Sequence, residues 1–138
     1  MPKAVFPALH NWMEHYISYG ETDGMGVLYN AEYLHLFERG RSKFCRDQGI
    51  GYAEIEKRGV ILPIRQAHCR YRSPARYDDK IMLCTGISTW NRASLTFVYE
   101  MYNEDRTKLL AEGSTEHACV SPEGKPFRIP EWLIKLFT

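Results

Sequence analysis

The sequence carries almost no net charge. It has 18 Lys and Arg residues against 17 Asp and Glu, which gives a formal net charge of +1 at pH 7. Such a chain has no general attraction for nucleic acid or anionic lipid, so we expect neither as a partner. Long apolar runs are also missing, and the N-terminal MPKAVFPALHNWMEHY lacks the apolar core of a signal peptide. These absences predict a cytoplasmic protein that does not insert into membranes.

Paired cysteine motifs are absent as well. Cys45, Cys69, Cys84 and Cys119 form no CxxC pair, which excludes a zinc knuckle and a thioredoxin motif and favours four reduced thiols. The histidines lack ligand-like spacing with Cys or Asp, so we expect no metal and no other cofactor. Nucleophile-elbow, P-loop, Rossmann and HExxH motifs are missing too. An enzyme with this sequence is therefore expected to use acid–base or carboxylate chemistry.

The composition that remains is typical of one globular domain, which we place over residues 1–138. Hydrophobic residues make up 44% and charged residues 25% of the 138 positions. A chain of this length buries roughly two-thirds of its unfolded surface, which is enough for a core.

One long helix is predicted from about Asn30 to Gln48. Its apolar residues recur at steps of three and four, which places them on one face: Tyr33, Leu36, Phe37, Gly40 and Phe44. Asn30 is a candidate N-cap, and Gly49 is a candidate C′ glycine. A glycine in mid-helix costs about 1 kcal/mol relative to alanine, so we expect Gly40 to allow close approach of the helix to a sheet.

The rest of the chain is typical of β-structure with two short helices. The expected strands are Trp12–Tyr19, Val60–Arg72, Lys80–Thr89, Ser94–Asn103 and Lys108–Val120, and the expected short helices are Tyr52–Lys57 and Pro130–Phe137. We expect a bulge at Gly113 in the last strand. One long helix can bury its apolar face only against a sheet that curls around it, so the fold class is α+β with an antiparallel sheet.

The segment Tyr19–Asn30 (YGETDGMGVLYN) carries the most chemistry. A carboxylate, Asp23, lies in a glycine loop just before the long helix, whose free N–H groups can hold an anion or an oxyanion. Asp23 could then attack a carbonyl or activate water to do so. The alternative is that Asp23 only stabilises a turn. Glu21 is a rival carboxylate two residues away.

This segment resembles the signature of the 4-hydroxybenzoyl-CoA thioesterase family, whose members are acyl-CoA thioesterases with the hotdog fold. The matching loop residues are Tyr19, Glu21, Thr22, Asp23, Gly26, Val27 and Tyr29. Further matches cover nearly the whole chain and include Tyr33, Phe37, Glu38, Arg41, Tyr71, Pro74, Asp79, Ser94, residues 117–120, residues 124–126 and Ile129-Pro130. The resemblance implies a curled antiparallel sheet of about five strands wrapped around one long α-helix.

The resemblance also implies residue roles. Asp23 matches the family's catalytic carboxylate, which acts as nucleophile or as general base. Asn30 matches the position whose backbone N–H polarises the thioester carbonyl. Many members carry His there, and Asn cannot be a general base at neutral pH, so either Asp23 works alone or the side chain at position 30 is only positional. Tyr29 and Arg92 match substrate-binding positions, and Arg92 would meet the phosphates of CoA.

The predicted function is hydrolysis of an acyl-CoA or acyl-carrier-protein thioester to a free acid and a thiol. The family implies a homodimer or homotetramer, and an open sheet has edges that a second copy can cover. Two alternatives remain: a non-catalytic acyl-thioester-binding protein, and an enoyl-thioester hydratase, which would need a His beside the carboxylate. His68, Arg70 and Arg72 share one strand face, which favours a solvated face or subunit contact over a phosphate site.

Overall fold

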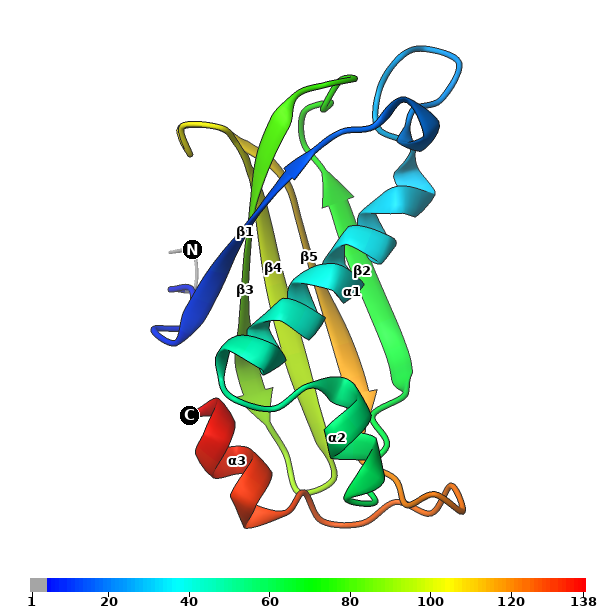
Figure 1. Cartoon of the computed structure of the whole chain (residues 1–138), viewed down its shortest axis with the longest axis vertical. Helices are drawn as coiled ribbons and strands as arrows, with labels where there is room; N and C mark the ends of the chain where they lie inside the picture. The colour runs from blue at the N-terminus through cyan, green and yellow to red at the C-terminus, as the bar shows by residue number, and fades with distance from the viewer. Residues whose placement is uncertain (1–4) are drawn as a thin grey trace.

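A five-stranded sheet and one long helix form most of the computed structural model, which describes residues 5–138 (Figure 1). Residues 1–4 of the expected 1–138 domain lie outside the described residues. The strands are β1 (His10–Tyr16), β2 (Ile64–Tyr71), β3 (Lys80–Trp90), β4 (Ser94–Asn103) and β5 (Leu109–Ala118). The helices are α1 (Asn30–Asp47), α2 (Tyr52–Lys57), α3 (Glu131–Phe137) and a short 3₁₀ turn, η1 (Tyr19–Glu21). The order is β1-β3-β4-β5-β2 and every neighbouring pair is antiparallel, which confirms the predicted fold class.

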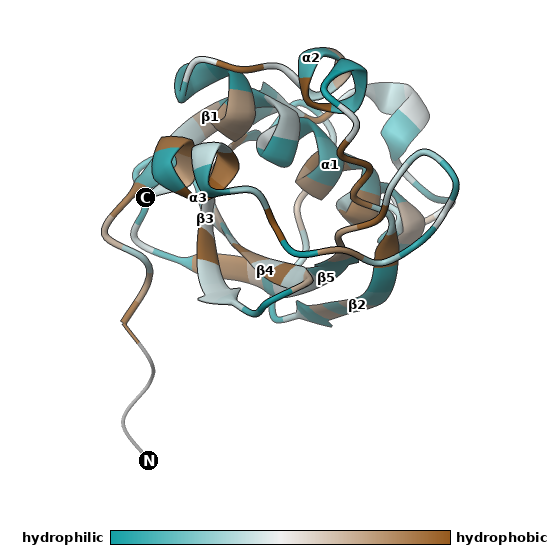
Figure 2. Cartoon of the chain, turned by 90° about the horizontal axis from the view of Figure 1, so that it is seen from below, coloured by the Kyte–Doolittle hydropathy of each residue, from teal (hydrophilic) through white to brown (hydrophobic). Residues whose placement is uncertain are grey.

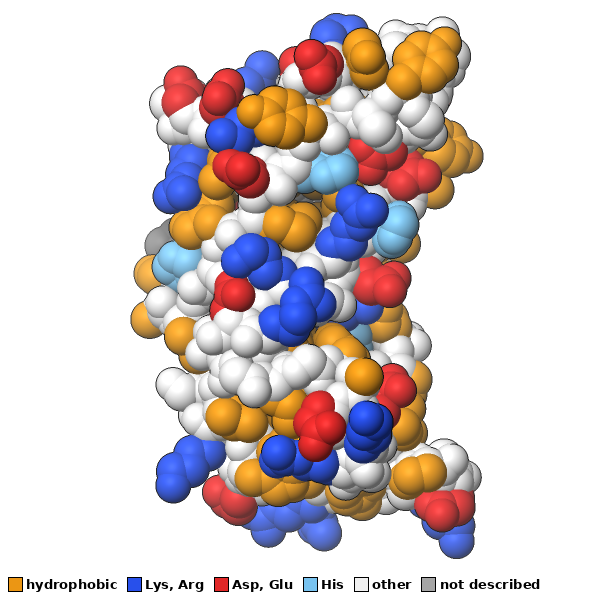
Figure 3. Space-filling view, in the orientation of Figure 1, with side chains coloured by type: hydrophobic (Ala, Val, Ile, Leu, Met, Phe, Trp, Pro, Cys, Tyr) orange, Lys and Arg blue, Asp and Glu red, His pale blue; other side chains and the backbone are white. Residues whose placement is uncertain are grey.

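The core lies between α1 and the sheet, which form two layers (Figure 2). The helix buries the predicted stripe together with Arg41 and Cys45. On the sheet side of the core, alternate residues of β4 are buried, all at most 1% exposed: Leu95, Phe97, Tyr99 and Met101. Phe37 stacks on Tyr99 with ring centroids 4.3 Å apart and planes 3° from parallel. The outward side of α1 carries Lys and Arg side chains interspersed with acidic ones, and Figure 3 shows the mixture.

Two glycines mark where the layers approach most closely. A Cβ on Gly40 would lie 2.6 Å from Thr85 Oγ1, which confirms the predicted reason for a glycine in α1. The bulge expected at Gly113 is wrong, because this residue pairs regularly with both neighbouring strands. A Cβ there would lie 2.5 Å from Phe37 Cε2, so the missing side chain leaves room for the Phe37 ring.

The first strand runs from His10 to Tyr16 and not over the predicted Trp12–Tyr19. Ile17 is β-branched and buried, but its backbone bonds to Asp78 and Asp79 in the turn before β3. The chain therefore leaves the sheet three residues before the predicted strand ends at Tyr19.

Other boundaries shift slightly. Tyr29 occupies the N-cap of α1, so Asn30 is its first helical residue and not the predicted cap. Likewise Pro130 caps α3 and does not lie in its first turn. The predicted Val60–Arg72 strand shortens to Ile64–Tyr71, preceded by an isolated bridge at Ile61.

β2 is an edge strand with unusual exposure. It pairs only with β5 in the sheet, and every residue except the partly buried Cys69 is exposed. Side chains on both of its faces therefore reach solvent. An edge of this kind is a surface on which another chain can pair.

A chain of polar side chains crosses the core beneath α1. Arg41 donates to the Tyr99 hydroxyl at 3.2 Å, which lies 2.6 Å from Thr115 Oγ1. Thr115 Oγ1 lies 2.8 Å from His117 Nε2, and His117 Nδ1 lies 2.9 Å from the Leu62 carbonyl. Because a carbonyl only accepts, Nδ1 carries the proton and Nε2 accepts from Thr115. His117 is thus a buried structural residue that links β5 to the segment before β2.

Acid is expected to weaken the fold through His117. Burial lowers its pKa from 6.5 to about 4, so the neutral ring contributes stability that is complete above pH 6.5 and falls as pH drops toward 4. The loss by pH 5 is about 2 kcal/mol in the free energy of unfolding. Urea unfolding of wild type and His117→Gln across this range is the measurement. A variant whose stability falls as steeply as that of wild type would contradict the assignment.

Candidate functional site

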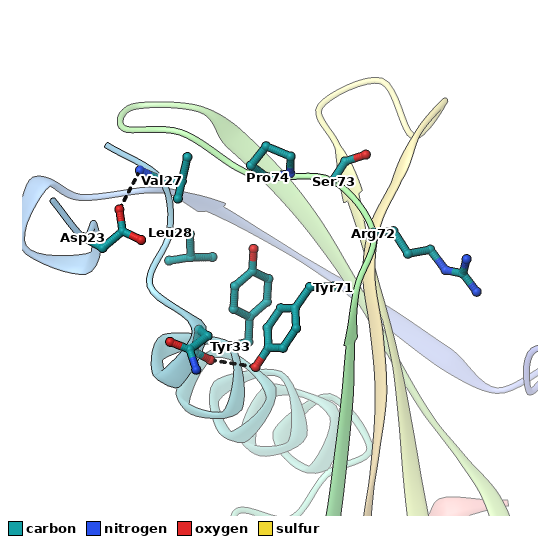
Figure 4. Close-up of a pocket in the computed structure, with 9 residues that line it drawn as sticks. Asp23, Val27, Leu28, Tyr33, Tyr71, Arg72, Ser73 and Pro74 are labelled. Atoms are coloured by element: carbon teal, nitrogen blue, oxygen red, sulfur yellow. Dashed lines mark hydrogen bonds between the residues drawn. The ribbon is translucent and has the colours of Figure 1, made fainter. Parts of the chain in front are cut away.

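An open cleft of about 340 Å³ lies at the start of α1 (Figure 4). Three segments form it: the loop before α1, the first turn of α1, and the end of β2 with the turn that follows. The lining residues are Asp23, Val27, Leu28, Asn30, Tyr33, Tyr71, Arg72, Ser73 and Pro74. The fold therefore brings the predicted carboxylate, Asp23, and the predicted amide position, Asn30, into one cleft.

Asp23 is held by its own loop. Its Oδ1 accepts from the Met25 N–H at 2.8 Å and the Val27 N–H at 3.4 Å, and its backbone N–H donates to the Val27 carbonyl at 2.9 Å. Gly26 closes the turn with φ +77°, where glycine is unstrained. Among the described residues no donor bonds to Oδ2. Asp23 thus stabilises a turn, as the alternative held, and still has one oxygen available for a substrate or a water.

The start of α1 supplies donors next to this carboxylate. Tyr29, the N-cap, makes no side-chain cap hydrogen bond, and the N–H groups of Asn30 and Ala31 have no acceptor within residues 5–138. Free amides at a helix start point away from the helix and carry a partial positive charge. They are suited to polarise a carbonyl whose carbon faces Asp23.

The rival carboxylate, Glu21, is already engaged. It bonds to His15 Nε2 at 2.9 and 3.0 Å and accepts from the Ser18 N–H at 2.7 Å. Burial alone would raise the pKa of Glu21, but the hydrogen bonds from Ser18 and His15 outweigh it and the pKa is lowered. Glu21 therefore anchors the loop and does not line the cleft.

Two tyrosines that the sequence did not assign to the site form a wall of the cleft. Tyr33 is buried, and Tyr71 packs edge-on against it with ring centroids 4.8 Å apart and an interplanar angle of 81°. The Tyr71 hydroxyl donates to the Asn30 carbonyl at 3.1 Å. Periodicity assigned Tyr33 to the core, and Tyr71 appeared only as a match of the resemblance. No local pattern links Tyr71 to a helix start 41 residues earlier.

The other two predicted residues lie outside the cleft. Tyr29 is 49% exposed and adjoins the lining residues without being one of them. Arg92 lies in the β3–β4 connection at the far end of the sheet (Figure 1). The 11 residues of β3 separate the two ends by roughly 35 Å at about 3.3 Å per residue. A single chain therefore does not bring Arg92 to Asp23.

His68 and Arg70 of β2, and Arg72 just after this strand, lie near two clefts. Arg72 borders the cleft but pairs with Glu112, with Nε 3.1 Å and Nη2 3.3 Å from the two carboxylate oxygens. Its pKa is raised by that hydrogen-bonded pairing. His68 and Arg70 line a separate cleft of about 510 Å³ on the sheet face away from α1. Glu112, which pairs with Arg72, also lines this second cleft, so a carboxylate lies among the three basic residues and disfavours a phosphate site there.

Within residues 5–138, no group of three or more His, Cys, Asp and Glu side chains is placed to hold a metal ion. Over the same residues, no helix combines the length and apolarity needed to cross a membrane.

Comparison with known proteins gives a consistent family. The thioesterase-like superfamily model matches residues 17–137. YneP of Bacillus subtilis (strain 168) is 32% identical over 121 residues, covering 84% of this chain and 87% of YneP. The acyl-CoA thioester hydrolase YbgC of Escherichia coli O6:H1 is 30% identical over 122 residues, covering 88% of this chain and 90% of YbgC.

A solved structure agrees with both relatives. The DHNA-CoA thioesterase from Staphylococcus aureus superposes with a TM-score of 0.83 at 32% identity, over 91% of this chain and 87% of that chain. The family model thus matches nearly all of the sequence, including the sheet, the long helix and the loop that holds Asp23. This chain belongs to the thioesterase-like superfamily of hotdog proteins.

Proposed function

We propose that this protein hydrolyses acyl-CoA thioesters to a free acid and a thiol. The observation that carries the proposal is the shared cleft, in which an oxygen of Asp23 and the free amides at the start of α1 lie together. The relatives support it, because YbgC is named an acyl-CoA thioester hydrolase and the S. aureus structure a DHNA-CoA thioesterase. Release of thiol from benzoyl-, short-chain and long-chain acyl-CoA by the wild-type protein is the direct test.

The chemistry follows from these groups. With the thioester oxygen at the Asn30 N–H, negative charge that develops on it is stabilised by the helix start. As general base, Asp23 takes a proton from water while the hydroxide attacks the carbonyl carbon. The C–S bond then breaks and the thiolate receives the proton. As nucleophile, Asp23 would instead attack the carbonyl carbon and expel the thiolate, which leaves a mixed anhydride. Water would then hydrolyse the anhydride, which releases the free acid and a proton for the thiolate and restores the Asp23 carboxylate. Asp23 is the one carboxylate among the residues that line the cleft.

The two alternative functions, thioester binding without catalysis and enoyl-thioester hydration, predict outcomes that differ from hydrolysis. A non-catalytic binding protein would bind acyl-CoA without releasing thiol. An enoyl-thioester hydratase would convert an enoyl into a 3-hydroxyacyl thioester and keep the C–S bond. The residues that line the cleft include no histidine, and a hydratase needs one beside the carboxylate, so hydrolysis is the better-supported reaction.

We further propose that two copies pair through β2 as a homodimer, which could associate into a homotetramer. The exposed β2 edge supports this, since pairing would satisfy its free backbone groups. If the β2 strands of two copies pair antiparallel about a two-fold axis, the two sheets run in opposite directions. The β3–β4 end of one copy then lies at the same end of the dimer as the Asp23 cleft of the other. Arg92 of the second copy would then approach the cleft that holds Asp23, which would reconcile its expected phosphate contact with its distant place in one chain.

Loss of Arg92 is expected to weaken recognition of CoA and not of the acyl group. Arg92→Ala should raise KM for acyl-CoA about tenfold, because a charge-assisted contact to phosphate is lost. KM for the matching acyl-pantetheine, which has no nucleotide phosphates, should not change. Steady-state kinetics on both substrates is the measurement, with the exposed Lys57→Ala as a matched loss of positive charge. Equal effects on both substrates would refute the assignment.

A further inference from the structure

Tyr71 connects the open edge of the sheet to the first turn of α1. Its hydroxyl donates to the Asn30 carbonyl at 3.1 Å, while its ring rests edge-on against Tyr33 (Figure 4). The residue is 50% exposed, so this bond is made at the mouth of the cleft and not in the core. Within residues 5–138, no other side chain of β2 bonds to this helix end, and Tyr29 provides no side-chain cap. Tyr71 therefore adds a side-chain bond from β2 to a helix start that backbone bonds of Leu28 and Tyr29 also hold.

The bonded carbonyl belongs to a particular peptide unit. The Asn30 carbonyl and the Ala31 N–H are the two ends of one planar group, so fixing the carbonyl also fixes the direction of the Ala31 N–H. A hydrogen bond at the oxygen also polarises the group and makes its N–H a stronger donor. Within residues 5–138 the Ala31 N–H has no acceptor. It lies beside the Asn30 N–H at the helix start, where both point out of the helix.

We propose that Tyr71 is a positioning residue for the oxyanion site, and that the Ala31 N–H is the second donor of that site. The inference rests on the proposed thioester hydrolysis. An oxyanion has lone pairs for more than one donor, and a second amide adds charge stabilisation only as the carbonyl becomes tetrahedral. Tyr71 strengthens this donor, because its bond to the Asn30 carbonyl polarises and restrains the peptide between Asn30 and Ala31.

The test removes the hydroxyl and keeps the ring. Tyr71→Phe is expected to lower kcat about tenfold and to leave KM within about twofold, because the donor acts mainly in the transition state. Tyr77→Phe is the matched control, since Tyr77 is also about as exposed and packs edge-on against another tyrosine, Tyr19. The Ala31 amide resonance in a ¹H–¹⁵N spectrum should shift in Tyr71→Phe and stay in place in Tyr77→Phe. Mass measurement in solution checks that the oligomeric state is the same in all three proteins.

The outcomes separate the two proposals. An active wild type with a slow Tyr71→Phe and a shifted Ala31 resonance supports the inference. Equal kcat for wild type and Tyr71→Phe, or a loss that appears in KM alone, overturns it and leaves hydrolysis intact. Loss in Tyr71→Leu with full activity in Tyr71→Phe also overturns it, because packing of the ring would then be the whole role. A wild type that releases no thiol from any acyl-CoA overturns the proposed hydrolysis and the inference with it.

Discussion

Asp23→Asn is expected to reduce thiol release from the best acyl-CoA substrate by at least about a hundredfold, the usual scale for loss of a general base or nucleophile. The substitution is nearly isosteric. An Asn oxygen can still accept from the Met25 N–H, which Asp23 Oδ1 meets at 2.8 Å, so the loop should keep its shape. The group that replaces Oδ2 is an NH₂, which neither takes a proton nor attacks a carbonyl at neutral pH. Steady-state rates and thermal unfolding of both proteins separate chemistry from folding.

Asp78→Asn is the matched control for this experiment. Asp78 is an exposed turn carboxylate with φ 65°, a conformation that Asn also adopts readily. It should retain wild-type rates. Rapid and equal hydrolysis by wild type and Asp23→Asn would mean that Asp23 serves the turn alone and that the catalytic assignment is wrong. Negligible rates in both would favour the binding-protein alternative or a carrier-bound acyl group.

Gly113→Ala is expected to cause the largest loss of stability, about 3 kcal/mol or more in the free energy of unfolding, on the scale of overpacked cores. The added Cβ would lie 2.5 Å from both Phe37 Cε2 and the His68 carbonyl oxygen. The ring cannot retreat, because Phe37 stacks on Tyr99 at 4.3 Å. The carbonyl cannot retreat either, because it belongs to the backbone of β2, which pairs with β5 at this position.

Urea unfolding curves of Gly113→Ala and Gly20→Ala provide the comparison. A Cβ on Gly20 meets nothing within 4 Å, so this variant carries the same chemical change without the collision. We expect a midpoint close to wild type for Gly20→Ala and a much lower one, or insoluble protein, for Gly113→Ala. Matching midpoints for the two variants would show that β5 and α1 can move apart at little cost.

The sequence predicts most reliably where structure follows a local period. The spacing of Tyr33, Phe37 and Phe44 places one helix on one face, and the alternation through β4 identifies its buried side. Prediction fails where contacts with a segment distant in the sequence determine the local structure. Ile17 has strand character, but the turn before β3 takes its backbone bonds, so β1 ends early. Gly113 is indistinguishable from a bulge glycine until the position of Phe37 is known.

The same distinction divides the candidate site. Asp23 and Asn30 lie in one short motif, so a resemblance in sequence is enough to pair them. Tyr71 joins them only because the sheet order places β2 at the edge near the start of α1, and its hydroxyl bond spans 41 positions. Arg92 is the opposite case: the resemblance in sequence assigns it to the site, but in one chain it lies at the end of the sheet away from Asp23.

The sheet order also bears on how the molecule assembles. β3, β4 and β5 are consecutive hairpins, whereas β1 and β2 join opposite edges and are separated in sequence by α1. Short loops close with little entropic cost, so we expect the three-stranded meander to form early and the outer strands to dock onto it afterwards. The cleft is built from segments attached to those late-docking strands. It should therefore be among the first regions to exchange its amide hydrogens, while the meander beneath it stays protected.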